Sequence, residues 1–328
     1  MNTQPHPPTL NTFPDETGTP EAHSAKVAIL LCTYNGSTFL GEQLDSFMLQ
    51  THKNWAIYAS DDGSNDETLT ILNRYKQKLG EDRLIILEGP RQGFAKNFLS
   101  LIKNSSIVAD YFAFSDQDDI WFKDKLERSI AKLAHIKGIP ALYCSRTRLV
   151  SSDGHVTGFS PLFLAPPEFG NALVQSIAGA NTMLINHQTR ELLAETADDA
   201  TIVAHDWLTY LLVSGCGGKV IYDSTPTLDY RQHAGNLIGA NASLKDRLIR
   251  LGRMCSGRFN EWSTQNLLVL NSFKQKLAPE NQLAMEQFEQ ARQSSFIRRL
   301  YLMKKSGIYR QTPQGNASLF LAACLNKI

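Results

Sequence analysis

The sequence predicts an α/β protein built on a doubly wound, mostly parallel sheet. Two observations lead to this prediction. Four short apolar runs of strand length alternate with segments whose apolar residues recur at helical spacing, and each run ends in polar or glycine-containing turn residues. Strictly alternating strands and helices are typical of a parallel sheet covered by helices on both faces. Ligands of such sheets bind beyond the carboxyl ends of the strands.

Composition and charge narrow the class of protein. The chain has 328 residues, is 42% hydrophobic and 20% charged, and has a net charge of +1, which is ordinary for a globular protein and argues against nucleic acid as a partner. The charge is uneven, because residues 241–328 carry 14 Lys+Arg against 5 Asp+Glu. That leaves 19 against 27 for the other 240 residues. An acidic body with a basic tail suggests a partner for the tail.

Cysteine usage and the absence of targeting signals suggest a compartment. The five cysteines are scattered and form no Cys-x-x-Cys pair, which fits a reducing compartment and argues against a structural zinc site. No signal peptide and no stretch of 18 apolar residues is visible. We therefore expect a cytoplasmic protein.

The elements follow in order along the chain. Residues 1–24 hold five of the thirteen prolines and predict a disordered leader. The continuous apolar run over 26–32 is typical of a strand covered on both faces. Further strands are expected over 54–60, 83–87 and 111–115, with helices over 39–48, from 64 onward and over 93–103. Ser64 or Asn65 is expected to cap the second helix, with Glu67 completing a capping box from Ser64.

The strand over 111–115 ends in Asp116-Gln117-Asp118-Asp119. Alternate side chains of an extended segment point the same way, so Asp116 and Asp118 would face one point. Two convergent carboxylates suit Mg²⁺ or Mn²⁺ with open positions left for a phosphate. A solvated acidic turn is the simpler alternative. Convergence of four polar clusters at one sheet edge favours a composite site instead, and these clusters are Thr33-Tyr34-Asn35, Asp61-Asp62, Gln92-Gly93 and Asp116 to Asp119.

The predicted site suits a nucleotide, although two common nucleotide-binding signatures are missing. The turn after the first strand contains neither Gly-x-Gly-x-x-Gly nor a P-loop, which disfavours a dinucleotide-dependent oxidoreductase and a P-loop NTPase. Tyr34 can stack on a base, and Asp62 can accept a hydrogen bond from a base N–H. Asp116 can accept from a ribose hydroxyl, and Asp118 can neutralise a diphosphate through a metal.

Four segments resemble, in order and spacing, those of family 2 glycosyltransferases, whose fold is GT-A. They are residues 29–36, 60–68, 92–97 and 116–121, and the resemblance extends over about residues 26–237. It implies a nucleotide-sugar donor and a glycan or lipid-linked glycan acceptor. The implied donor-binding residues are Thr33, Tyr34, Asn35, Asp62, Gly93, Lys96 and Asp116. Lys96 stands where the family often has Arg, so a cation is kept and a bidentate phosphate contact is lost.

The second half of the chain carries the acceptor side of this resemblance. Residues 175–182, around Gly179, look like the loop in front of the donor sugar, and residues 204–208 look like the catalytic-base motif. Residues 230–233 look like a motif of bacterial rhamnosyltransferases. Asp206 is thereby the predicted general base, and a single base without a nucleophilic carboxylate implies inversion at the anomeric carbon.

Roles and alternatives follow for the remaining residues. Asp118 and His233 are the implied metal ligands, and the implied acceptor or diphosphate contacts are Gly179, His205, Trp207 and Arg231. Plainer interpretations remain open: Asp206 could cap a helix from Trp207 onward, and His205 could pack on Trp207. Arg231 and His233 could lie on a surface loop. Trp121 is expected to pack beneath the acidic loop.

Three parts of the chain are expected: the leader 1–24, a catalytic domain over 25–240, and a basic helical C-terminal extension over 241–328. Within the catalytic domain, 25–122 would be the nucleotide-sugar half and 123–240 the acceptor half. Residues 295–305 are basic and amphipathic. They could lie on an anionic membrane, peripherally on the cytoplasmic face of the inner membrane, or pack on the catalytic domain with a solvated basic face.

The sequence thus predicts a metal-dependent, inverting glycosyltransferase that builds a bacterial surface polysaccharide, with dTDP-rhamnose or a UDP-sugar as donor. A sugar nucleotidyltransferase would want a glycine-rich, basic loop after the first strand, and Thr33-Tyr34-Asn35-Gly36 is not one. From another class, a catalytically inactive nucleotide-sugar or glycan-binding protein remains an alternative. Retention of both Asp118 and Asp206 argues against it.

Overall fold

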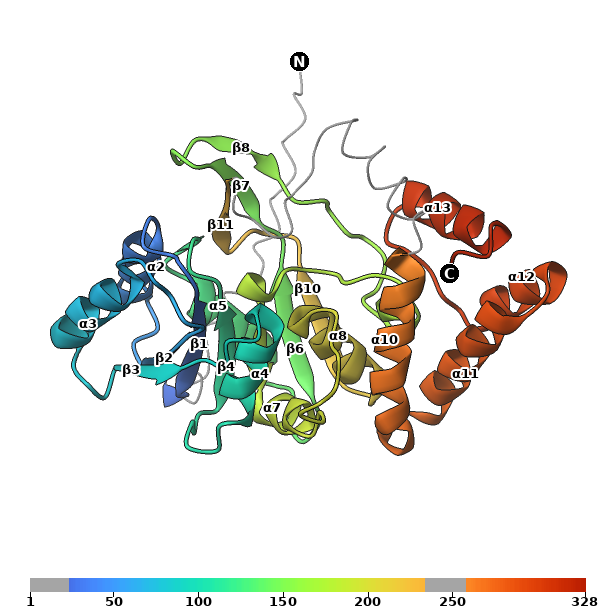
Figure 1. Ribbon diagram of the computed structural model, residues 1–328, viewed down its shortest axis with the longest axis horizontal. Helices are drawn as coiled ribbons and strands as arrows, with labels where there is room; N and C mark the ends of the chain where they lie inside the picture. Colours follow the sequence, from blue (N-terminus) through green and yellow to red (C-terminus); the bar gives the residue numbers. More distant parts are fainter. Residues whose placement is uncertain (1–23, 234–257) are drawn as a thin grey trace, which may run out of the picture.

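The computed structural model describes residues 24–233 and 258–328 and contains two sheets (Figure 1). The larger has the strand order β10-β6-β9-β4-β1-β2-β3. Its strands are β10 (Lys219–Asp223), β6 (Ala141–Ser145), β9 (Leu184–Asn186), β4 (Tyr111–Ser115), β1 (Val27–Thr33), β2 (Trp55–Asp61) and β3 (Leu84–Glu88). Neighbouring strands are parallel except at β9, which runs antiparallel to both β4 and β6. The predicted mostly parallel α/β sheet is confirmed.

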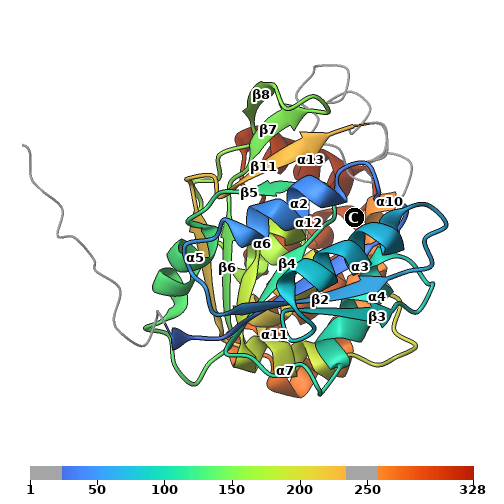
Figure 2. The same cartoon turned by 90° about the vertical axis from the view of Figure 1, so that its left-hand side faces the viewer.

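Helices cover both faces of this sheet. The helices before the C-terminal region are α2 (Leu40–Met48), α3 (Thr68–Leu79), α4 (Phe94–Lys103), α5 (Lys125–Leu133), α6 (Phe169–Ala172), the 3₁₀ turn η1 (Ala180–Thr182), α7 (His187–Ala194) and α8 (His205–Gly215). Figure 2 shows α2 and α3 on one side of the strands and α4 and α7 on the other side.

The position of strand β1, with both faces covered, explains why its sequence is continuously apolar rather than alternating. Ala28, Leu30 and Cys32 belong to the core cluster that contains α4, α7 and α8. Val27, Ile29 and Leu31 belong to the cluster on the opposite face, with α2, α3 and α5. Because both faces are covered, every position of the strand is buried, as expected for a central parallel strand.

A second, smaller sheet was not predicted, and it positions part of the site. Its order is β5-β11-β7-β8, and its strands are β5 (Ile120–Trp121), β11 (Leu228–Gln232), β7 (Arg148–Ser151) and β8 (Val156–Phe159). Strand β5 immediately follows the acidic loop and pairs antiparallel with β11. The sheet therefore brings the end of β11, more than a hundred residues away in sequence, against the acidic loop.

The predicted capping box of the second helix is wrong. Helix α3 begins at Thr68, and its N-cap residue Glu67 makes no side-chain cap. The Ser64 hydroxyl instead donates to Asp61 Oδ2 at 2.6 Å, so it organises the loop after β2. The carboxylate of Asp66 accepts from the Thr68 N–H at 3.0 Å and satisfies an amide of the first turn in its place.

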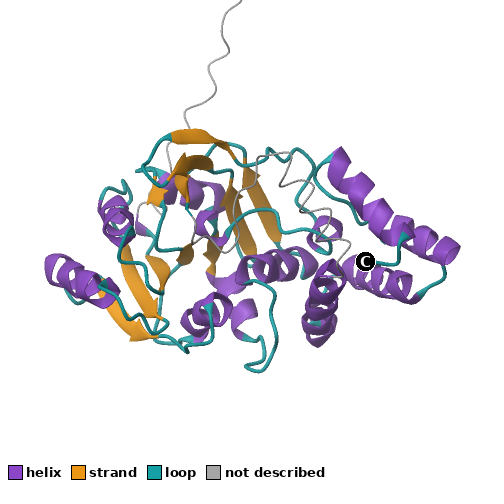
Figure 3. Ribbon diagram, turned by 45° about the horizontal axis from the view of Figure 1, so that its top comes forward, coloured by secondary structure: helices purple, strands orange, loops and turns teal. Residues whose placement is uncertain are grey.

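The C-terminal helices pack against the α/β unit. They are α10 (Arg258–Ser272), the 3₁₀ turn η2 (Lys274–Lys276), α11 (Pro279–Gln293), α12 (Phe296–Lys305) and α13 (Pro313–Cys324). Leu267, Leu270 and Phe273 join the core cluster of α8, whereas Leu268 is 67% exposed. Figures 1 and 3 show these helices gathered on one side of the sheets.

Some predictions fall on residues that the structure does not describe. These are the leader up to residue 23 and the domain boundary at 240. Over the described ranges, no helix is both long and apolar enough to cross a membrane.

Candidate active site

The loops after β1 and β4 are joined by the side chain of Gln117. Its Oε1 accepts from the Tyr34 N–H at 2.8 Å, and its Nε2 donates to the Tyr34 carbonyl at 2.9 Å. A Cβ atom on Gly36 would lie 2.1 Å from Gln117 Oε1, so a side chain there would displace this pairing. The Tyr34 ring is left 59% exposed beside the acidic loop.

The loops after β1 and β2 are joined by Asp61 and Asn35. The buried Asp61 carboxylate accepts from the hydroxyls of Thr33 at 2.8 Å and Ser64 at 2.6 Å. The Asn35 N–H donates to Ser64 Oγ, and its side-chain oxygen accepts from the Asn65 N–H, both at 2.9 Å. Thr33 and Asn35, predicted to bind the nucleotide, therefore also fix the shape of the loops that would hold it.

Asp62 orders the loop after β3. Its carboxylate accepts from the backbone N–H groups of Arg91 at 2.6 Å and Gly93 at 2.8 Å. Gly93 has φ = 87°, which favours glycine, and helix α4 begins directly after it. Lys96, on the first turn of α4, donates from Nζ to the Asp198 carbonyl and so reaches the loop before α8. The four polar clusters therefore do converge at one edge of the sheet.

The acidic loop holds three carboxylates in different environments. Burial, together with the negative charges of Asp118 and Asp206, raises the pKa of Asp116 to about 7. Asp118 Oδ2 lies 2.8 Å from Nε2 of His233, which follows β11. His233 also packs against the ring of Phe39, with 5.1 Å between centroids. The smaller sheet thus delivers an imidazole to Asp118.

Asp119 and Lys125 are both fully buried at this loop, which the sequence analysis did not identify. Burial and the charges of Asp118 and Asp116 raise the pKa of Asp119, whose carboxylate accepts from the Asn181 amide. Burial lowers the pKa of Lys125 to about 7, with Asp119 opposing that shift. Lys125 Nζ lies 4.3 Å from the centroid of the Trp121 ring, which is itself buried beneath the loop as predicted.

Arg231 links the acidic loop to two other elements. Its buried guanidinium donates to the Asp118 carbonyl at 3.2 Å and to the Ser152 carbonyl at 2.8 Å. It also forms an ion pair with Glu42 of α2 at 2.6 Å. The side chain predicted to contact acceptor or diphosphate is therefore engaged within the protein, where it holds the loop in place.

Asp206 lies in the first turn of α8. One carboxylate oxygen accepts from the Trp207 N–H at 2.7 Å. Burial raises the pKa of Asp206 to about 6, while the Trp207 N–H and the Ser176 hydroxyl act to lower it. Its charge raises the pKa of Asp116, so the carboxylates of the acidic loop and of α8 are close enough to interact. A half-buried carboxylate with this pKa is suited to take up a proton near neutral pH.

His205 and Trp207 do not lie with Asp206 at the site, which corrects their prediction as substrate contacts. The buried His205 ring stacks on Phe98 with 3.9 Å between centroids and also meets Phe94 and Phe114 edge-on. The packed-histidine alternative is therefore right, with Phe98 as partner rather than Trp207. Trp207 is also buried, and its indole N–H donates to the Ala172 carbonyl at 2.7 Å.

His205→Phe is expected to stabilise the protein by about 1 kcal/mol without loss of activity, because both buried ring nitrogens lack hydrogen-bond partners. Burial lowers the pKa of His205 to about 3. The unfolded chain binds a proton below pH 6.5 that the folded protein does not, so the advantage of Phe should grow as the pH falls further. Thermal unfolding at two pH values measures this. The exposed His187 in α7 supplies the control, His187→Phe, which should give no gain. Loss of activity at unchanged stability would instead indicate a substrate contact.

Gly179 lies in a loop that contacts the acidic loop through Asn181. It precedes η1, and a Cβ atom there would lie 2.9 Å from Asn181 Oδ1. Because Asn181 also holds Asp119, this loop and the acidic loop are mechanically joined. Gly179 allows a close approach to Asn181, and Asn181 supplies the hydrogen bond to Asp119. The role of Asn181 was not predicted.

The donor set at the acidic loop fits a divalent cation with few protein ligands. Asp118 Oδ2 and His233 Nε2 converge, and no group of three or more His, Cys, Asp or Glu side chains in residues 24–233 and 258–328 is arranged to hold a metal. One or two protein ligands, with the remaining positions left to phosphate and water, is the usual arrangement for Mg²⁺. Carboxylate and imidazole together also suit Mn²⁺.

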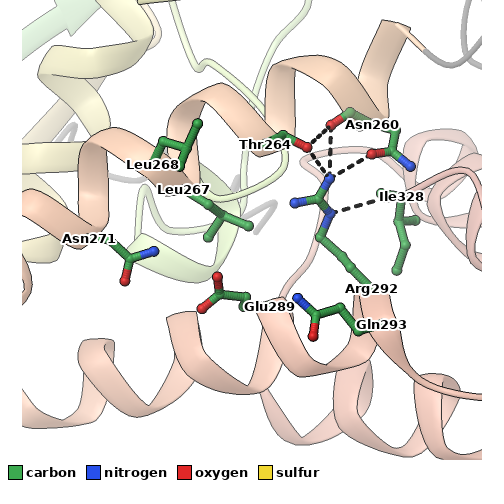
Figure 4. A pocket seen from close by; sticks show the side chains of 9 residues that line it. All are labelled: Asn260, Thr264, Leu267, Leu268, Asn271, Glu289, Arg292, Gln293 and Ile328. Atoms are coloured by element: carbon green, nitrogen blue, oxygen red, sulfur yellow. Dashed lines mark hydrogen bonds between the residues drawn. The ribbon is translucent and has the colours of Figure 1, made fainter. Parts of the chain in front are cut away.

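A cavity elsewhere in the molecule takes no part in this site. It has a volume of about 310 Å³ and lies among helices of the C-terminal region (Figure 4). Arg292 spans its wall, donating to the Asn260 carbonyl at 2.9 Å and to Thr264 Oγ1 at 2.6 Å. None of the predicted site residues lines it.

Comparison with known proteins agrees with the geometry. Residues 28–144 match the family model of glycosyl transferase family 2. The chain is 32% identical over 256 residues to dTDP-rhamnosyl transferase RfbG of Shigella flexneri, covering 74% of this chain and 86% of that protein. It is 28% identical to the putative teichuronic acid biosynthesis glycosyltransferase TuaG of Bacillus subtilis, covering 49% and 62%. The chain spans only 17% of the length of an uncharacterized glycosyltransferase of Rickettsia felis.

Solved structures show the same fold. The structure of S. aureus TarS 1-349 in complex with UDP-GlcNAc superimposes with a TM-score of 0.55 at 15% identity, covering 92% of this chain and 88% of that one. The mannosyltransferase PcManGT from Pyrobaculum calidifontis, in complex with GDP-Man and Mn²⁺, gives 0.50 at 15% identity, covering 98% and 89%. At this identity the likeness shows the fold alone, and the fold is GT-A. The chain is a glycosyltransferase that belongs to glycosyl transferase family 2.

Proposed function

We propose that the protein transfers a sugar, with inversion, from a dTDP-linked donor such as dTDP-rhamnose to a glycan of a bacterial surface polysaccharide. The observation that carries this proposal is that Asp206, in the first turn of α8, lies near enough to affect Asp116 in the acidic loop, where Asp118 and His233 converge. The named relatives support the sugar and the pathway, since one is a dTDP-rhamnosyl transferase and another a putative teichuronic acid glycosyltransferase.

The donor would lie along the edge formed by the loops after β1, β2, β3 and β4. The exposed ring of Tyr34 would stack on the base, and Asp116, directly after β4, would accept from a ribose hydroxyl. Asp62 already accepts two backbone hydrogen bonds, so its contact with a base N–H would share an occupied carboxylate. Lys96 would have to leave the Asp198 carbonyl to reach a phosphate.

In the transfer step, the acceptor hydroxyl oxygen bonds to the anomeric carbon as the bond from that carbon to the diphosphate oxygen breaks. Asp206 takes the hydroxyl proton, and the bonding pair leaves with the nucleoside diphosphate. Direct attack by a single displacement inverts the anomeric centre. Asp118 and His233 would hold a divalent cation, which when bound neutralises charge on the leaving diphosphate.

The acceptor is proposed to be a glycan or a lipid-linked glycan, approached from the side of the loop that carries Ser176 and Gly179. If the acceptor is lipid-linked, the basic stretch 295–305, which contains the whole of α12, would bring the protein to the membrane that carries it. The Arg231 guanidinium would contribute to acceptor binding only indirectly, because its hydrogen bonds hold the acidic loop between the two sheets.

A donor panel tests the proposal. Calorimetry with UDP, dTDP and GDP, each with and without Mn²⁺, is expected to show binding of dTDP that requires the metal. Tyr34→Ala should weaken that binding about tenfold or more, through lost stacking of about 1–3 kcal/mol. Tyr301→Ala, equally exposed on α12, is the matched control. Binding of no nucleotide by folded protein would refute the donor site, and binding of UDP alone would refute the dTDP donor.

A further inference from the structure

The last 35 residues form a surface with an unusual combination of charge and apolar exposure. Residues 294–328 contain six Lys+Arg and no Asp or Glu. Six large apolar side chains in this segment are also exposed, by 43–81% of their surface. They are Phe296, Ile297, Tyr301, Phe320, Leu321 and Leu325. Exposed apolar residues gathered in this way commonly mark an interaction surface.

Helix α12 shows the arrangement residue by residue. Ile297, Tyr301, Lys304 and Lys305 follow the spacing i, i+4, i+7 and i+8, which places them on one face. Leu302 and Met303 point the other way and are buried. None of Arg298, Lys304 and Lys305 forms an ion pair with a described residue, so this positive charge is not neutralised within the described parts of the chain.

Helix α13 packs on α12 and also exposes apolar residues, although it has no charged side chain. Its buried residues are Leu319, Ala322 and Ala323, while Phe320, Leu321 and Leu325 face outward. The buried Arg299 of α12 donates to the Ala323 carbonyl at 2.9 Å, which ties the two helices together. Figure 1 shows both on the side of the molecule away from α3. We call α12 and α13 together the C-terminal lobe.

The connection between α12 and α13 is anchored on the loop next to the catalytic base. The Gln311 N–H donates to Gln175 Oε1 at 3.0 Å, and the Tyr309 carbonyl accepts from the Asn171 amide at 3.0 Å. The next residue after Gln175 is Ser176, whose hydroxyl bonds to Asp206. The C-terminal lobe is therefore held beside the acceptor side of the site.

A third exposed element adjoins this connection. The Ala165 N–H donates to Gln311 Oε1 at 3.2 Å, and the preceding residue, Leu164, is 84% exposed. Leu164 belongs to the loop between β8 and α6, so an apolar residue from the acceptor half joins those of the lobe. The apolar exposure is thus not a property of one amphipathic helix.

We propose that the C-terminal lobe, with Leu164, docks on the surface of an anionic lipid bilayer and thereby presents the site to an acceptor held in that membrane. Apolar side chains would enter the boundary between headgroups and acyl chains, and the lysines would reach the anionic headgroups. Residues 1–240 have an excess of eight acidic residues and would be repelled, so charge also sets the orientation. The membrane-bound acceptor rests on the proposed function, whereas the docking itself does not.

Sedimentation of the full-length protein with vesicles tests the docking. Vesicles of phosphatidylcholine mixed with phosphatidylglycerol are expected to bind the protein, and vesicles of phosphatidylcholine alone to bind it about tenfold or more weakly. Lys304→Glu with Lys305→Glu should weaken binding to the anionic vesicles by a similar factor, and Ile297→Ser with Phe320→Ser should also reduce it about tenfold. Leu49→Ser with Lys132→Glu changes equally exposed residues far from the lobe and should bind as the wild type does.

Three results would overturn the proposal. The wild type could fail to bind anionic vesicles, or the lobe variants could bind as well as the control. The protein could also be a dimer that Ile297→Ser with Phe320→Ser dissociates, which would make the lobe an interface between copies. Transfer to a short water-soluble glycan should be unchanged in all variants. Failure of that transfer in the wild type would count against the proposed function and leave vesicle binding as a separate result.

Discussion

Asp206→Asn is expected to slow sugar transfer by about 10²–10⁴-fold while leaving donor binding unchanged. The substitution keeps the size of the side chain and an oxygen for the Trp207 N–H, but it removes the group that takes the acceptor proton. The measurement is the transfer rate under saturating donor, with donor affinity by calorimetry on the same preparation. Asp124→Asn changes an exposed aspartate that directly precedes helix α5 and serves as the matched control.

The pH dependence of the wild type identifies the same residue. Asp206 must be ionised to act as a base, and its pKa is raised to about 6, so kcat/KM should fall as the pH drops through about 6. Ser176→Ala removes a hydroxyl that lowers this pKa, so the acidic limb should move to higher pH. A limb that stays in place in Ser176→Ala would assign it to another group. Full activity in Asp206→Asn would show that Asp206 only caps α8.

Asp118→Ala is expected to reduce kcat/KM by about 10³-fold and to abolish the effect of Mn²⁺ on donor binding. The reason is that Asp118 and His233 are the convergent donor pair at the acidic loop, and a cation held by so few protein ligands depends on each of them. Metal titrations followed by calorimetry, with and without dTDP, measure this directly. Asp82→Ala, on an exposed aspartate before β3, should behave as the wild type.

His233→Asn separates a metal ligand from a structural contact at the same place. If the Asp118–His233 hydrogen bond only stabilises the fold, both substitutions should lower the thermal unfolding temperature and leave the response to Mn²⁺ intact. If the pair holds a cation, His233→Asn should weaken the Mn²⁺ dependence of donor binding, by less than Asp118→Ala does. Donor binding that needs no metal in the wild type would contradict the metal site altogether.

The sheet was predictable because its information is local. The run from Val27 to Cys32 is apolar at every position, which only a strand covered on both faces requires. The same holds for the placement of the polar clusters, since parallel strands end at one edge and their following turns must meet there. Gln117 is an example of what that argument misses: its contact with Tyr34 spans 83 residues and depends on loop shape.

The antiparallel strand β9 and the whole second sheet were not predictable in the same way. Strands β5 and β9 have two and three residues, too few for a periodic signal. Yet β5 pairs with β11, and that pairing brings Arg231 and His233 to the acidic loop. A family resemblance suggested those residues, but only the pairing of distant strands gives them partners.

The sequence by itself determined the fold class, the site edge and the residue types that carry the chemistry, because strand periodicity and turn composition are local properties. Tertiary structure decided which side chains reach the site. Successive residues of a helix are about 100° apart, so when Asp206 of α8 faces the acidic loop, His205 and Trp207 must turn into the core. The burial of Lys125 near Asp119 could not be predicted from the sequence either. A lysine in an amphipathic helix normally reaches solvent, and only the surrounding packing prevents it here.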